Sequence, residues 1–140
     1  MMEAGSNVLT SLLGIPHFLL YLAVGIALLA LFVLAYMKIT PHDELALIRE
    51  GNMTASVALS GTIVGFVIPL AKSIAQATSI PDMLIWGLAA FVVQLIAFML
   101  IRVLIPDLSA RIQSNTLAAG TLLAAGSIAS GMLNAAAMSL

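Results

Sequence analysis

The sequence predicts an all-α integral membrane protein, a four-helix bundle made of two parallel-related two-helix hairpin repeats with both termini in the periplasm. Three observations predict this fold. Only 8% of the 140 residues are charged whereas 62% are hydrophobic, the uncharged residues gather into four long runs, and the chain matches itself at a shift of 65 residues. A soluble domain needs roughly 25% charged residues to cover its surface. Lipid must therefore cover most of this one.

The four uncharged runs are long enough for transmembrane helices, which need about 20 apolar residues each. They cover residues 18–37, 51–71, 83–101 and 112–140. The first run lacks the basic leader and small-residue cleavage site of a signal peptide, so we expect it to be retained as a helix. Because the connections between the runs are short, neighbouring helices must be antiparallel. Residues 1–140 are thus predicted to form a single transmembrane domain.

The basic residues predict the orientation of the bundle. Lys38 and Arg49 lie in the first connection and Arg102 and Arg111 in the third, whereas the second connection holds only Lys72. Since cytoplasmic loops are enriched in Lys and Arg, the first and third connections are predicted to be cytoplasmic. Both termini then lie outside.

An internal repeat covers residues of about 15–75 and about 80–140. At a shift of 65 residues, Pro16 falls on Pro81 and Pro41 on Pro106. The segment Gly61-Thr62-Ile63 falls on Gly126-Ser127-Ile128. Each copy contains two spans, so the copies have the same orientation and are related by an axis along the membrane normal.

Prolines mark expected helix starts and one kink. Proline is tolerated in the first turn of a helix, where an N–H group would have no partner. Thr40 lies one residue and Ser79 two residues before a proline, and each is followed three residues on by an Asp, as in a capping box. Residues 41–50 are read equally well as a short amphipathic helix at the membrane surface or as a solvated connector. The expected helix-start prolines are Pro16, Pro41, Pro81 and Pro106, and the expected kink is at Pro69.

Small residues predict which helices pack most closely. Helices in lipid associate through small residues that let their backbones approach. The second span carries Gly61 and Gly65, and the repeat places Gly126 and Ser130 at the corresponding positions of the fourth. A second small-residue stripe on the fourth span contains Gly120, Ala124, Ser127, Gly131 and Ala135. The second and fourth spans are therefore predicted to form the packed centre.

Few polar side chains fall within the spans, and such residues are candidate functional sites. Gln94 lies near the middle of the third span and either bonds another helix or lines a path through the membrane. Arg102 is expected to reach the cytoplasmic headgroups and, with Arg111, to bind anionic lipid. Asn134, in the fourth span, also needs a polar partner.

Several function classes are disfavoured. The chain has no Cys, and its two His residues show no chelating spacing, so no metal or cofactor site is predicted. No pairing of a nucleophile with a base can be assembled from the sequence, which predicts that the protein is not an enzyme. Its net charge of -1 argues against nucleic-acid binding. No Asp, Glu or His lies within the four runs, which disfavours a proton-driven transporter.

The chain resembles the YjfL family of small bacterial inner-membrane proteins. The resemblance runs from about residue 18 to 138 and rests on Lys38-Ile39-Thr40-Pro41-His42, Asn52, Ser60-Gly61-Thr62, Ile68-Pro69-Leu70, Ser79-Ile80-Pro81-Asp82, Gln94-Leu95 and Asn134-Ala135-Ala136. It implies a multi-pass protein of the bacterial inner membrane whose molecular activity is unknown. It also implies a peripheral partner that resembles phage-shock protein A and acts in envelope stress.

Two functions follow as hypotheses. The first is a non-enzymatic homo-oligomer that serves as a membrane scaffold or docking site through its cytoplasmic loops. The alternative is a subunit of an oligomeric small channel or transport pathway, in which Gln94 would line the path.

Overall fold

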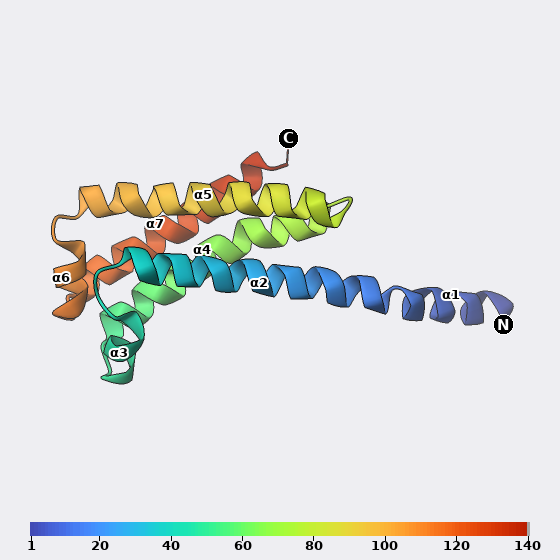
Figure 1. Cartoon of the computed structure of the whole chain (residues 1–140), viewed down its shortest axis with the longest axis horizontal. Helices are drawn as coiled ribbons and strands as arrows, with labels where there is room; N and C mark the ends of the chain where they lie inside the picture. Colours follow the sequence, from blue (N-terminus) through green and yellow to red (C-terminus); the bar gives the residue numbers. More distant parts are fainter. Residues whose placement is uncertain (140) are drawn as a thin grey trace.

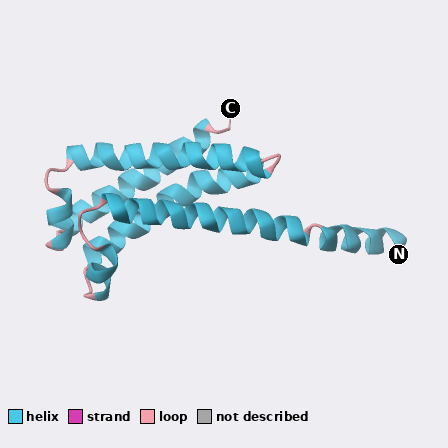
Figure 2. Ribbon diagram, viewed as in Figure 1, coloured by secondary structure: helices cyan, strands magenta, loops and turns pink. Residues whose placement is uncertain are grey.

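A computed structural model describes residues 1–139, and the regular structure of this part of the chain is entirely helical (Figures 1 and 2). The helices are α1 (Met2–Leu13), α2 (Ile15–Ile39), α3 (Glu44–Arg49), α4 (Met53–Gln76), α5 (Ile80–Leu104), α6 (Leu108–Gln113) and α7 (Leu117–Ala137). Four helical stretches are long and apolar enough to cross a membrane: α1 with α2, α4, α5 and α7. The predicted all-helical, four-span architecture is thereby confirmed.

The four long helices run alternately in opposite directions, so the connections gather at two ends of the bundle (Figure 1). The short helices α3 and α6 lie together at one end. The α4–α5 connection lies toward the other end, and α1 projects beyond it as an extension of α2. We call the first of these the α3/α6 end.

Helix α4 is the centre of the bundle and packs against α2, α5 and α7. Its contact with α7 is the most extensive, as small residues on both helices predict. One apolar cluster near the α3/α6 end surrounds Tyr36 and Phe98, and another surrounds Phe32 and Phe66. The Phe32 and Phe66 rings stack with centroids 4.3 Å apart, which joins α2 to α4.

The fourth span begins later than predicted. The predicted span starts at residue 112, but α6 ends at Gln113 and α7 begins at Leu117. Between them Asn115 has a φ of 60°, a left-handed conformation that Asn tolerates better than most residues. Its side-chain oxygen accepts hydrogen bonds from the backbone and hydroxyl of Thr54, which hold the break in place. The other predicted limit, residue 140, lies outside the described residues.

The first predicted capping box is wrong, whereas the cap of the second is present. Thr40 precedes Pro41 and is extended, with a ψ of 130°, as residues before proline prefer. It therefore ends α2, and its hydroxyl donates to the Met37 carbonyl. Asp43 caps α3 instead, so Pro41 lies outside that helix. At α5, Ser79 accepts from the backbone N–H of Asp82 as predicted.

Candidate functional site: a polar network at the α3/α6 end

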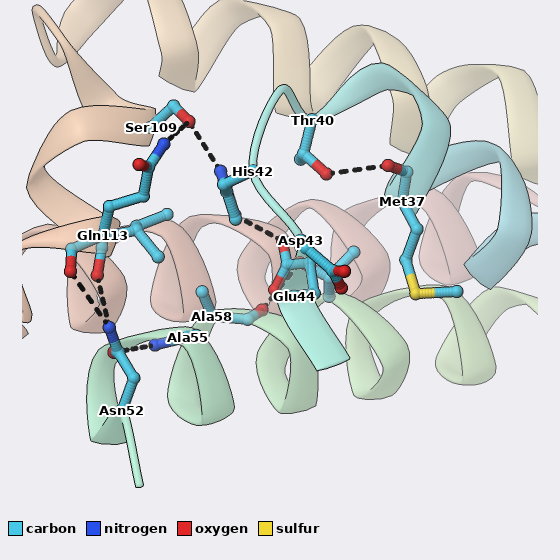
Figure 3. A network of polar contacts seen from close by, with 12 residues as sticks. Met37, Thr40, His42, Asp43, Glu44, Asn52, Ala55, Ala58, Ser109 and Gln113 are labelled. Carbon is cyan, nitrogen blue, oxygen red and sulfur yellow. Dashed lines mark hydrogen bonds and ion pairs between the residues drawn. The ribbon is translucent and has the colours of Figure 1, made fainter. Parts of the chain in front are cut away.

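Two asparagines join the halves of the chain at the α3/α6 end. Asn52 caps α4 by accepting from the Ala55 N–H, while its amide nitrogen lies 2.9 Å from the Ile112 carbonyl and 3.3 Å from that of Gln113 (Figure 3). Asn115 makes the reciprocal connection to the first turn of α4 through Thr54. The end of α6 and the start of α4 are thus held together by hydrogen bonds between residues that are 60 or more positions apart in the sequence.

A chain of three polar side chains connects α6 to α3 (Figure 3). The Ser109 hydroxyl lies 2.6 Å from Nδ1 of His42, and Nε2 of His42 lies 2.8 Å from Oε1 of Glu44. His42 and Glu44 are both buried, whereas Ser109 is half-buried. Burial strengthens the His42–Glu44 hydrogen bond because water does not compete for its donor and acceptor.

A further contact extends this chain of polar side chains. The side-chain amide nitrogen of Gln113 donates to the Ser109 hydroxyl oxygen at 3.3 Å. When the neutral imidazole of His42 carries its proton on Nε2, it donates to Glu44 and accepts a hydrogen bond from the Ser109 hydroxyl at Nδ1. The hydroxyl, imidazole and carboxylate therefore have the connectivity of a nucleophile, a base and an orienting acid.

Two buried oxygens beside the network have no hydrogen-bond partner among the described residues. They are Oε2 of Glu44 and the hydroxyl of Tyr36. The Tyr36 hydroxyl lies near the side chains of Glu44 and Thr62. Thr62 donates to the carbonyl of Ala58 within its own helix. Polar groups without partners are costly inside a protein and are candidates for a functional role.

Hollows in the surface give access to the network. One, of about 410 Å³, is lined by Pro41, Arg102, Asp107, Leu108, Ser109, Ala110 and Gln113. Another, of about 230 Å³, reaches His42 from the α3 side and is lined by Pro41, His42, Asp43, Ala46, Leu47, Glu50 and Gln113. Ser109 and the cationic Arg102 thus border the same hollow.

The structure places six of the predicted small residues between α4 and α7. Gly61 lies against Ala124, and Gly65 lies against both Ser127 and Gly131. Gly120 lies against Thr54, where a built Cβ would be 2.7 Å from the Thr54 carbonyl oxygen. Of the other predicted pair, Gly126 instead faces the Ile101 side chain of α5, and Ser130 is half-buried.

The predicted intramembrane polar residues all lie on spans but do not meet. The Gln94 amide nitrogen donates to the Ser127 carbonyl at 3.1 Å, and its buried Oε1 has no partner among the described residues. The Asn134 amide donates to the Ala90 carbonyl, so both side chains connect α5 to α7. Arg102 is exposed in the last turn of α5. Arg111, in α6, donates to the Pro106 carbonyl.

The remaining predicted residues are prolines. Pro16 and Pro81 occupy the first turns of α2 and α5. Pro106, like Pro41, lies outside the short helix that follows, because Asp107 precedes α6 as its cap residue. Pro69 lies inside α4 and is buried.

Sequence reasoning missed the Ser109–His42–Glu44 chain. His42 and Ser109 are 67 residues apart, and no motif connects them. The only local signal is that His42 and Glu44 flank the start of a short amphipathic helix. The described residues contain no group of three or more His, Cys, Asp or Glu that could hold a metal ion.

These features define a multi-pass membrane protein with a polar network at one end of its helix bundle. The chain belongs to the family described as Domain of Unknown Function (DUF350), which it matches over residues 9–138. It is 42% identical to the UPF0719 inner membrane protein YjfL of Escherichia coli (strain K12), over 94% of this chain and 98% of that protein.

A more distant relative is the UPF0719 transmembrane protein YshE of Bacillus subtilis (strain 168), at 30% identity over 61% of this chain and 64% of YshE. No solved structure matches the chain significantly. The resemblance expected from the sequence is confirmed, and the chain is a multi-pass inner-membrane protein.

Proposed function

We propose that the protein is a docking scaffold of the inner membrane whose α3/α6 end is a preformed cytoplasmic platform for a peripheral membrane protein. The chain is built from two parallel hairpin repeats, and both termini lie in the periplasm. Copies assemble into a homo-oligomer, which would present several platforms together and strengthen weak individual contacts.

The observation that carries this proposal is the concentration of side-chain hydrogen bonds between the two halves at the α3/α6 end. His42 contacts Ser109, Asn52 contacts two carbonyls at the end of α6, and Asn115 contacts Thr54. Such cross-connections hold both short helices in one geometry before any partner arrives. A surface that is ordered in advance loses less conformational entropy on binding.

Charge at this end supports the same proposal. Arg49 ends α3 and Arg111 is near the end of α6, and both are exposed. Cationic groups at this level favour the cytoplasmic side and attract anionic lipid headgroups or acidic protein surfaces. The family resemblance suggests a partner similar to phage-shock protein A.

The test is binding of that purified peripheral protein to the full chain reconstituted in lipid nanodiscs. The double variant Arg49→Glu with Arg111→Glu should bind at least about tenfold more weakly, which corresponds to about 1.4 kcal/mol. Lys72→Glu, on α4 toward the opposite end, is the matched control and should bind like the wild type. Absence of wild-type binding, or an equal loss in the control, contradicts the proposal.

A second candidate function is ester cleavage at the membrane surface, and the alignment of Ser109, His42 and Glu44 favours it. This candidate departs from the sequence-based expectation of a non-enzymatic protein. Ser109 Oγ would attack the carbonyl carbon of a lipid ester while its proton passes to Nδ1 of His42 and then to the departing alcohol. Water would hydrolyse the acyl-Ser109 by the reverse proton path. Arg102, which borders the same hollow, would attract a substrate with an anionic headgroup.

An alkyl fluorophosphonate probe separates the two candidates. On the reconstituted protein, a nucleophilic Ser109 would form a covalent adduct detectable by mass spectrometry. Ser109→Ala and His42→Ala should abolish that adduct, and Ser114→Ala, an exposed serine at the same end, should retain it. A folded wild-type protein that forms no adduct rules out the catalytic candidate and leaves the docking proposal intact.

A further inference from the structure

Helix α1 is amphipathic, and its main contacts are with α2. All of its residues are exposed. At 100° per residue, one side of the helix carries an apolar stripe and the other a polar stripe. The apolar stripe consists of Met2, Val8, Leu9, Leu12 and Leu13. The polar stripe consists of Glu3, Ser6, Asn7 and Thr10.

The exposure of the apolar stripe is large. The exposed fractions are 60% for Val8, 58% for Leu9 and 72% for Leu13. A continuous apolar stripe of this kind marks a surface that binds either lipid or another protein. On the polar side, the hydroxyls of Ser6 and Thr10 donate to carbonyls of their own helix, so this side is satisfied without a protein partner.

Length shows that α1 is not needed to cross the membrane. Helix α2 alone has 25 residues and is therefore about 37 Å long at 1.5 Å per residue. The hydrocarbon core is only about 30 Å thick. If α1 continued straight beyond α2, its leucines would stand in water above the bilayer.

A hinge between the two helices allows another course. Gly14 separates α1 from α2, and Pro16 lies in the first turn of α2. Because Pro16 has no N–H, the Leu12 carbonyl four residues earlier loses its usual donor. The Gly14 N–H is shared between the carbonyls of Thr10 and Ser11. Helices bend most readily at such places.

We propose that α1 lies flat in the lipid headgroup region of the leaflet opposite the α3/α6 end, with its apolar stripe turned into the acyl chains. Val8, Leu12 and Ile15 follow one another at helical spacing, so this stripe is continuous with the lipid-facing side of α2. Glu3 is the only charged side chain of α1. Binding therefore depends on apolar burial and does not require anionic lipid. The inference uses the membrane location of the chain and is independent of the docking proposal.

Single nitroxide labels test the position of α1. The chain has no native Cys, so Leu9→Cys and Asn7→Cys can each be labelled in the full protein, reconstituted in phosphatidylcholine vesicles. Accessibility to oxygen reports lipid exposure, and accessibility to a water-soluble nickel chelate reports water exposure. We expect the Leu9→Cys label to favour oxygen and the Asn7→Cys label to favour nickel. The same contrast should hold after addition of phosphatidylglycerol.

Two results would overturn this inference. If both labels are accessible to nickel, α1 projects into water. If the Leu9→Cys label is protected from both reagents and broadened by a neighbouring label, the stripe packs against a second copy of the chain. Leu12→Glu, studied with the Leu9→Cys label, should increase its accessibility to nickel at least about threefold. Ser11→Glu, near the polar side, is the matched control and should leave that accessibility unchanged.

Discussion

The Gly65 carbonyl shows how single residues position the central helix pair. Pro69, four residues later in α4, has no N–H to donate to it. The backbone of Gly131 in α7 packs directly over this carbonyl oxygen, so the second helix covers a polar group that α4 leaves open. A Cα–H group at this short range is a weak donor. Only a glycine allows so close an approach, because a Cβ at position 131 would overlap Gly65.

At this scale we predict that Gly131→Ala destabilises the protein by about 1–3 kcal/mol, because its new Cβ meets fixed backbone. Gly126→Ala on the same helix meets only the end of the Ile101 side chain. That side chain can move, so the cost should stay below about 1 kcal/mol. Equilibrium unfolding of the full chain in mixed micelles measures both changes. Equal costs would show that the α4–α7 backbones are not in direct contact.

At the scale of elements, α4 begins after a residue whose side chain makes three hydrogen bonds. Asn52 caps the helix through Ala55 and also donates to the Ile112 and Gln113 carbonyls. That Asn52 caps a helix can be predicted from the sequence, since Asn favours the N-cap position. Its contacts with the end of α6 cannot, because they depend on how two segments far apart in the sequence meet.

We predict that Asn52→Ala lowers the free energy of unfolding by about 2–4 kcal/mol, from the lost cap and the lost hydrogen bonds to the end of α6. Asn52→Ser can still cap the helix, so it should recover about 1 kcal/mol of that loss. Asp43→Ala removes an exposed helix cap that makes no hydrogen bond to the other half of the chain, so it should cost about 1 kcal/mol or less. The same unfolding measurement, with hydrogen exchange at Ala55, checks the series. A cost for Asn52→Ala no larger than that for Asp43→Ala would contradict it.

At the scale of the whole molecule, the arrangement of the four spans brings α3 and α6 to one end (Figure 1). The helices α2 and α5 are each 25 residues long, and α3 and α6 are each six. The predicted repeat pairs these helices, and it also pairs α4, of 24 residues, with α7, of 21. The excess of Lys and Arg at the α3/α6 end favours its cytoplasmic placement.

Single cysteines test that topology in the cysteine-free chain. A membrane-impermeant maleimide applied to intact spheroplasts should label Thr78→Cys, in the α4–α5 connection. It should label Glu50→Cys and Ser114→Cys, at the α3/α6 end, only after the membrane is permeabilised. All three positions are exposed, so a difference in labelling reports the side of the membrane. The reverse pattern would place both termini in the cytoplasm.

The sequence by itself determined that this is a helical inner-membrane protein with four spans, and it singled out the small residues that meet between α4 and α7. Hydropathy, charge and proline positions are local properties, so they can be read along one chain. Only the tertiary structure decided that Gly126 faces α5, that Asn115 separates α6 from α7, and that Ser109 meets His42 and Glu44. Those features depend on the rotation of each helix and on contacts between residues up to 67 positions apart, which no local pattern specifies.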